Sequence, residues 1–158
     1  MQAININHIT NNPQATADKE LLKGALDALK ETTGTIAHLV QMQPKAAKNI
    51  VADAVLEVKR GTNKIRYFVE IKRTLPTGAL GHVVAQLQRF KKPGMLIARY
   101  ITPPMAERLR ELDVPFIDTA GNAYINAPPL FVYVTGRKLP ELNIGDNLLY
   151  PSHVIFKD

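Results

Sequence analysis

The clearest pattern in the chain is an alternation of apolar and polar residues from Ile65 to Lys72, with Phe68 as the one apolar residue at a polar position. Side chains two positions apart on a strand point to the same face, so the alternation predicts a β-strand that is buried on one face. A preceding strand is expected over residues 53–58, and the turn residues of 59–64 join the two strands as a hairpin. The apolar run 95–99 predicts another strand inside the same sheet.

Helical spacing of apolar residues predicts three helices around these strands. The first begins near Asp18, a suitable N-cap residue, and ends at Gly34. The second covers about residues 79–91, and the third starts at Pro103 behind the N-cap residue Thr102. Residues 35–43 fit either a strand or a helical turn. Further short strands are expected over residues 114–118, 123–125 and 130–134. The order of these elements predicts an α/β fold, with a central mixed β-sheet flanked by helices.

The length of 158 residues suits one domain with short extensions. We expect a flexible polar arm over residues 1–16, an α/β domain over 17–138 and a C-terminal extension over 139–158 that could bind a protein partner. The chain has no cysteine, which excludes disulfides and thiolate metal sites. No apolar run is long enough to span a bilayer, and we expect a cytoplasmic protein without a membrane partner.

The charge of the chain favours polyanionic partners. There are 20 Lys and Arg residues against 14 Asp and Glu residues, a formal net charge of +6. DNA is the first candidate partner, because no lipid-directed feature accompanies the charge. The alternative is a basic surface without a specific partner. Basic residues near the hairpin and the second helix are candidate DNA contacts: Arg66, Arg73, Arg89, Lys91 and Lys92.

Three charged residues of the predicted hairpin form a candidate catalytic site. Glu70 and Lys72 share a strand face, and antiparallel pairing brings Asp53 beside the end of the same strand. Two carboxylates, with the Ile71 carbonyl as a third oxygen, suit Mg²⁺ or Mn²⁺. Lys72 would orient water and stabilise the negative charge that develops during phosphodiester hydrolysis. The alternative is a solvated strand face on which Glu70 and Lys72 merely pair with each other.

Gln86 lies on the polar stripe of the second predicted helix, with Phe90 one turn later. Its amide could donate to a phosphate or a base edge, although a surface amide without a role fits the same pattern. The four histidines have no zinc-ligand spacing, and no glycine-rich phosphate-binding loop is present.

The succession of Asp53, the Glu70-Ile71-Lys72 strand and the helix with Gln86 resembles the PD-(D/E)xK nuclease superfamily. The Gln86-to-Phe90 step is similar to the Gln-x-x-x-Tyr motif of its RecB-type and Holliday-junction-resolvase-like branches. Residues 114–125 resemble a bacterial group described as AbiEi-type antitoxins or transcriptional regulators. The resemblance covers about residues 21–138, and it implies a restriction-endonuclease-like core.

These observations lead to two functional hypotheses. The first is a metal-dependent DNA endonuclease with Mg²⁺ or Mn²⁺ as its cofactor, in which Asp53, Glu70 and Lys72 are catalytic. The second is a non-catalytic DNA-binding regulator or antitoxin-like module that uses the same fold. A structural domain of a larger assembly and a homodimer remain further options, because a fold does not by itself establish a function.

Overall fold

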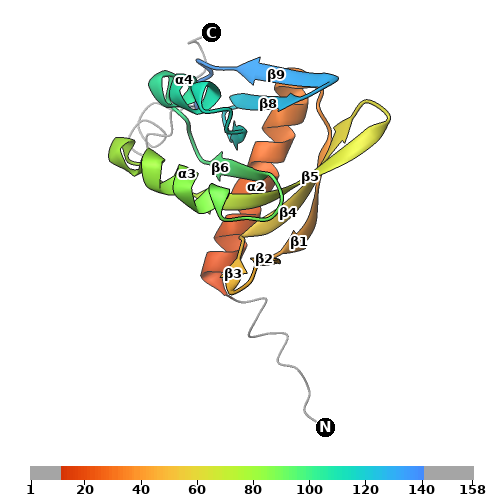
Figure 1. Ribbon diagram of the computed structural model, residues 1–158. Helices are drawn as coiled ribbons and strands as arrows, with labels where there is room; N and C mark the ends of the chain where they lie inside the picture. The colour runs from red at the N-terminus through yellow and green to blue at the C-terminus, as the bar shows by residue number, and fades with distance from the viewer. Residues whose placement is uncertain (1–11, 141–158) are drawn as a thin grey trace.

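A seven-stranded sheet forms the centre of the protein in the computed structural model, which describes residues 12–140 (Figure 1). The strand order is β1-β4-β5-β6-β7-β8-β9, and only the β5–β6 and β6–β7 pairs are parallel. The strands are β1 (Ala37–Met42), β4 (Ala54–Arg60), β5 (Asn63–Lys72), β6 (Gly94–Ala98), β7 (Phe116–Asp118), β8 (Ala123–Ala127) and β9 (Leu130–Val134). A separate small hairpin joins β2 (Lys45–Ala47) to β3 (Ile50–Val51). The expected central sheet flanked by helices is therefore confirmed, although most of its strand pairs are antiparallel.

Among residues 12–140, three α-helices cover the two faces of the sheet (Figure 1). Helix α2 (Pro13–Thr33) packs its buried residues Leu22, Ala25 and Leu29 against one face. Helices α3 (Leu80–Gln88) and α4 (Pro103–Glu111) cover the other face, and the one-turn 3₁₀ helix η1 (Thr77–Ala79) leads into α3. None of the helices in residues 12–140 combines the length and apolarity that crossing a membrane requires.

Strand β5 follows the alternation expected from the sequence. Tyr67, Val69 and Ile71 are buried in the core beneath α2. Phe68 packs on the opposite face, in a small cluster with Val55 of β4. Glu70 and Lys72 share that second face, because they follow Phe68 at alternate positions. The predicted hairpin is confirmed, and a tight turn between Arg60 and Asn63 joins β4 and β5.

The first helix starts earlier than the sequence analysis predicts. It begins at Pro13, so the four residues 13–16 of the expected arm are helical. The Asn12 side chain accepts a hydrogen bond from the Gln14 amide at 2.9 Å, and Pro13 occupies the first helical position, where its missing N–H costs nothing. Asp18 is therefore a residue of the second turn and not the N-cap. Gly34 ends the helix as expected, in a left-handed conformation.

The structure settles one segment that the sequence left open and corrects one predicted boundary. Residues 37–42 form the edge strand β1, which resolves the ambiguity of 35–43 in favour of a strand. Helix α3 ends at Gln88 instead of continuing to Lys91, so Lys91 and Lys92 lie in the connection that leads to β6. Pro93 follows directly, and a residue that precedes proline is disfavoured in helical conformation.

Candidate functional site

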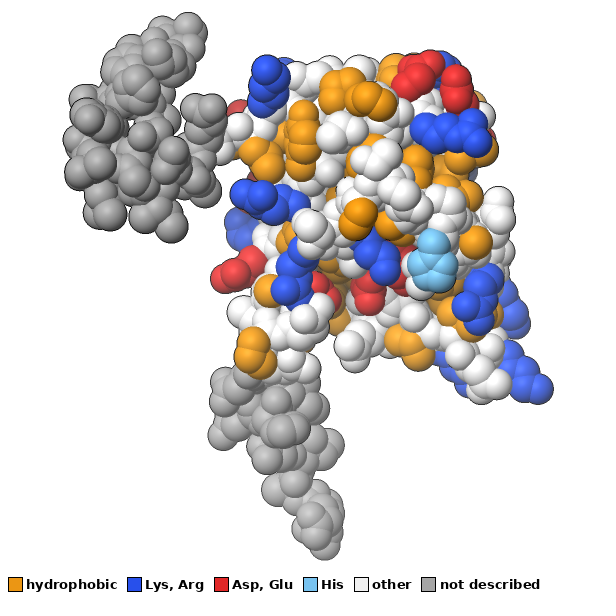
Figure 2. All heavy atoms as spheres, turned by 90° about the vertical axis from the view of Figure 1, so that its left-hand side faces the viewer, with side chains coloured by type: hydrophobic (Ala, Val, Ile, Leu, Met, Phe, Trp, Pro, Cys, Tyr) orange, Lys and Arg blue, Asp and Glu red, His pale blue; other side chains and the backbone are white. Residues whose placement is uncertain are grey.

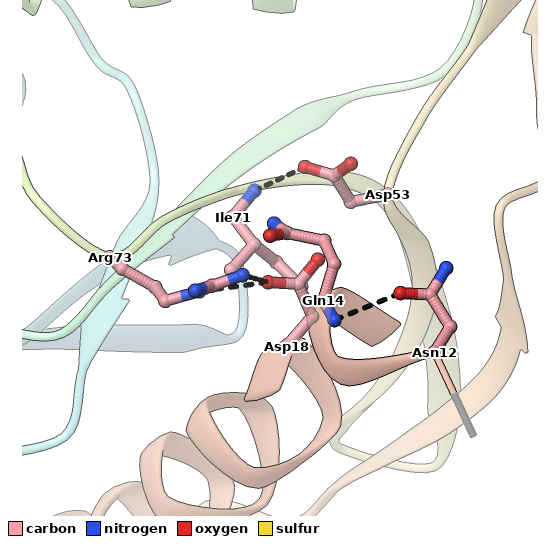
Figure 3. Close-up of polar contacts among 6 residues, drawn as sticks. All are labelled: Asn12, Gln14, Asp18, Asp53, Ile71 and Arg73. Carbon is pink, nitrogen blue, oxygen red and sulfur yellow. Dashed lines mark hydrogen bonds and ion pairs between the residues drawn. The ribbon is translucent and has the colours of Figure 1, made fainter. Parts of the chain in front are cut away.

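Asp53 lies in the connection between β3 and β4, where two hydrogen bonds tie it to β5 and a third ties it to the residue after β1. Its amide donates to the Val69 carbonyl at 2.9 Å, and its carbonyl accepts from the Gln43 amide at 2.9 Å. Its carboxylate Oδ2 accepts from the Ile71 amide at 2.7 Å (Figure 3). The side chain is thus held in place along the last residues of β5, and the second carboxylate oxygen is not used by this hydrogen bond.

Glu70 and Lys72 stand next to this carboxylate on β5. The Lys72 ammonium lies 3.6 Å from Oε2 of Glu70, and the Lys72 and Glu70 side chains are 31% and 12% exposed. This ion pair is therefore more shielded from water than a typical surface pair. The structure brings together the three residues that the sequence analysis selected, Asp53, Glu70 and Lys72.

The two carboxylates influence each other's ionisation. Burial raises the pKa of Asp53, the hydrogen bond from Ile71 lowers it, and the charge of Asp18 raises it again. Burial raises the pKa of Glu70 as well, and the negative charge of Asp53 adds to this effect. Lys72 lowers the pKa of both groups without cancelling the other effects. A cation placed between the two carboxylates would favour the ionised form of each.

Helix α2 contributes an acidic residue that the sequence analysis did not include in the site. Asp18 forms an ion pair with Arg73 at 3.3 Å, and its charge acts on Asp53. Gln14, one turn earlier, points from α2 toward the space between Asp18 and Asp53 (Figure 3). The helical period could have indicated Asp18, because it lies four residues before the buried Leu22.

The direction of the Ile71 backbone decides whether its carbonyl could join the expected metal ligands. The N–H and C=O of one strand residue point to the same side, and the Ile71 amide points to Asp53. The Ile71 carbonyl is therefore directed to the side of Asp53 and away from β6. Two carboxylates and this carbonyl are hard oxygen donors, and water and a substrate phosphate would complete six-coordination of Mg²⁺. Within residues 12–140, no three His, Asp or Glu side chains come close enough together to hold a metal.

Two of the expected DNA contacts are engaged within the protein. Arg66 donates to Glu57 of the neighbouring strand at 3.0 Å. Arg73 pairs with Asp18 next to the candidate site. Their charges are partly neutralised by these carboxylates, which weakens the attraction that each can offer to a phosphate.

The other expected DNA contacts lie near the end of α3. Arg89 is exposed directly after the helix, and Lys91 and Lys92 are exposed in the connection to β6. Gln86 is half-buried on α3, and its side-chain oxygen Oε1 is buried without a hydrogen-bond partner among residues 12–140. On the face drawn in Figure 2, basic side chains surround a small group of acidic side chains.

Comparisons of this chain with protein-family models, curated proteins and solved structures give no match. The functional assignment therefore rests on the residues described above.

Proposed function

We propose that this chain is a metal-dependent endonuclease domain that hydrolyses DNA phosphodiester bonds, with a restriction-endonuclease-like core. The observation that carries the proposal is the position of Asp53. The hydrogen bond from Ile71 holds its carboxylate at the end of the strand that bears Glu70 and Lys72. Two carboxylates can hold a divalent cation, and a neighbouring ammonium can stabilise the negative charge that develops on a phosphate.

Asp53, Glu70 and the Ile71 carbonyl would hold Mg²⁺ or Mn²⁺. When bound, the ion supplies Lewis acidity at the phosphate and lowers the pKa of water. Lys72 would donate a hydrogen bond to the attacking water or to a non-bridging phosphate oxygen. In the reaction, a water oxygen bonds to phosphorus and loses a proton to solvent, and the P–O bond to the leaving strand breaks. The leaving oxygen then takes up a proton.

The raised pKa values of the two carboxylates support this assignment. Burial opposes the ionised form of Asp53 and of Glu70, and the two negative charges oppose each other. Such an arrangement is unfavourable for folding alone, and clusters of this kind are concentrated at functional sites. A divalent cation would remove the electrostatic conflict.

A non-catalytic DNA-binding regulator or antitoxin-like module is the second candidate. The observation that favours it is the Lys72–Glu70 ion pair, which compensates part of the charge of Glu70 without a metal. In that case the same residues would stabilise the fold, and basic residues elsewhere would bind DNA.

Cleavage assays with matched variants distinguish the two candidates. The wild-type chain is incubated with linear, supercoiled, single-stranded and junction DNA in Mg²⁺ or Mn²⁺. Glu70→Gln and Lys72→Ala should each reduce cleavage by about 10²–10³, because each removes an oriented group that serves the charged transition state.

The Glu57–Lys64 pair on the same hairpin provides the control, since its 3.5 Å ion pair is similar but lies away from Asp53. Glu57→Gln and Lys64→Ala should leave the cleavage rate within a few-fold of wild type. Tight DNA binding without cleavage of any substrate would favour the non-catalytic module. Cleavage that survives in Glu70→Gln and Lys72→Ala would place the activity elsewhere.

A further inference from the structure

A basic pocket lies beside the candidate site, between the β2–β3 hairpin and the connection after α3. Its volume is about 440 Å³, within the range of small-ligand sites. Four lysines form its rim: Lys45, Lys48, Lys91 and Lys92. Phe68, Ala46 and Ala47 complete the lining and supply an apolar floor.

The floor of this basic pocket is fixed by packing and hydrogen bonds. Phe68 is 7% exposed, and its ring meets that of Phe90 edge-on with centroids 5.7 Å apart. Ala46 is 2% exposed, and its carbonyl accepts from the Lys91 amide at 3.2 Å. This hydrogen bond joins the two walls of the pocket. The lysine side chains, by contrast, are exposed at the rim.

Within residues 12–140, no carboxylate balances the charge of the basic pocket. No acidic residue lines it, and none of the ion pairs found between residues 12 and 140 involves its four lysines. Arg66 and Arg73, in contrast, each have a carboxylate partner. Four ammonium groups around one hollow, with no carboxylate partner in the described part of the chain, repel one another, and a polyanion would remove this repulsion.

The combination of rim and floor indicates the chemical class of the ligand. Ammonium groups bind phosphate, whereas the apolar floor, in which Ala47 is more exposed than Phe68 and Ala46, suits contact with a base. An inorganic anion would leave the floor unused. A nucleotide uses both parts. A base paired within a duplex is not free to enter a pocket of this size, so the ligand has an unpaired base.

The basic pocket also lies in line with the candidate site. Phe68, Glu70 and Lys72 follow one another on the same face of β5. At the rise of a strand, Phe68 and Glu70 are about 7 Å apart along β5. A nucleic-acid strand at Glu70 would therefore place a neighbouring nucleotide near Phe68.

We propose that the basic pocket binds one nucleotide of single-stranded DNA, with the base on the Phe68 floor and the adjoining phosphates on the four lysines. The position of this nucleotide next to the reacting phosphodiester rests on the proposed nuclease function. Binding of the strand itself does not, because it requires neither a metal nor cleavage.

The test is fluorescence anisotropy of labelled dT₁₂ with the full chain, at low salt and with EDTA. Lys48→Ala/Lys92→Ala should weaken binding roughly tenfold or more and reduce the slope of log K against log salt by about 1.4, the value for two lost phosphate contacts on a single strand. The matched control is Lys30→Ala/Lys138→Ala, which removes two exposed lysines elsewhere. It should change the affinity only slightly.

The apolar floor is tested separately. Ala47→Glu places a carboxylate in the pocket at a half-buried position and should abolish binding, with circular dichroism confirming the fold. Wild type should bind dT₁₂ more tightly than an abasic 12-mer with the same phosphates. Equal affinity of wild type for the two oligonucleotides would overturn the proposal. An equal loss of dT₁₂ affinity in the two double lysine variants would overturn it as well. Tighter binding of U₁₂ would overturn the assignment to DNA.

The outcomes separate the pocket from the nuclease proposal. If Lys48→Ala/Lys92→Ala loses dT₁₂ affinity while wild type cuts no DNA, the pocket is supported and the nuclease function fails. If wild type cuts DNA and the Lys48→Ala/Lys92→Ala variant binds dT₁₂ as tightly as wild type does, only the pocket proposal fails.

Discussion

Replacement of Asp53 by asparagine and by alanine should have opposite effects on stability. In both variants the negative charge is lost, and with it the unfavourable burial that raises the pKa of this group. The Asp53→Asn variant would retain a side-chain oxygen that can accept the hydrogen bond from the Ile71 amide, which is 2.7 Å long in the wild-type chain. The Asp53→Ala variant would leave that amide without its partner.

The expected loss of stability in Asp53→Ala follows from this single hydrogen bond. An N–H that loses its acceptor in a buried position costs about 1–3 kcal/mol, which for a chain of this size lowers Tm by about 2–12 °C. Asp53→Ala should therefore melt below wild type in metal-free buffer. Asp53→Asn should melt at or above wild type, because it keeps the hydrogen bond and removes the buried charge.

Thermal melts with EDTA measure the effect of the Ile71 hydrogen bond on stability, and melts with Mn²⁺ measure the effect of metal binding. A metal at ten times its Kd would stabilise wild type by about 1.4 kcal/mol, and neither variant should show this gain. Equal Tm values for Asp53→Asn and Asp53→Ala in EDTA would refute the structural role of the Ile71 hydrogen bond. The same Mn²⁺ shift in wild type and in Asp53→Asn would refute the metal site.

Three further predictions concern Glu70 and the turn before β8. Because Glu70 has a raised pKa, its protonation stabilises the fold; this contribution is complete below the ordinary pKa of 4.5 and is lost as pH rises through the folded-state value. In metal-free urea titrations, the midpoint of Glu70→Gln relative to wild type should therefore increase from pH 4 to pH 7, and a constant difference would contradict this. Asp118→Ala should reduce the free energy of unfolding, measured in urea, by about 3 kcal/mol or more, because the buried Asp118 carboxylate accepts four hydrogen bonds. A loss below about 1 kcal/mol would be inconsistent with that role. Gly121→Ala should lower Tm, because Gly121 has a φ of +98° and an added Cβ would lie 2.5 Å from Cγ2 of Thr32. Adding Thr32→Ser, which removes Cγ2, should recover part of the loss. If nothing is recovered, the whole cost comes from the backbone conformation.

The sequence predicted the elements whose pattern is set locally. Alternation on β5 identified both faces of that strand, and the apolar run at 95–99 identified β6. Thr102 and Pro103 marked the start of α4, where the Thr102 hydroxyl accepts from the Met105 amide at 3.4 Å. In each case the short-range pattern and the final packing favour the same structure.

Elements that depend on distant contacts were not predictable in the same way. The β2–β3 hairpin has only a few residues per strand, and backbone contacts such as Lys91 with Ala46 hold it in place. The start of α2 was misplaced because Asp18 is also a good N-cap residue, whereas Asn12 and Pro13 provide the actual cap. Nothing in the local sequence indicates that the carboxylate of Asp18 reaches Arg73, 55 residues later.

The segment that resembles the AbiEi-type group, residues 114–125, has a structural explanation. Asp118 lies at the end of β7 and accepts hydrogen bonds from Ile101, Ala120 and Asn122. The Asn122 side chain in turn binds the backbone of Arg137 through both its oxygen and its nitrogen. This network closes the turn before β8 and fixes the chain that follows β9. The pattern of residues 118–122 is therefore accounted for by folding alone, and it adds no support for either proposed function.

The nuclease and the binding module differ in how the charge of Glu70 is compensated. In a binding module, Lys72 alone must balance a carboxylate that burial and Asp53 both disfavour. At neutral pH, loss of Lys72 would then destabilise the protein equally with and without Mn²⁺. In a metal site, the cation shares this role, and loss of Lys72 would be tolerated once Mn²⁺ is bound. The stability of Lys72→Ala with and without metal therefore reports on the site even where no cleavage substrate has been found.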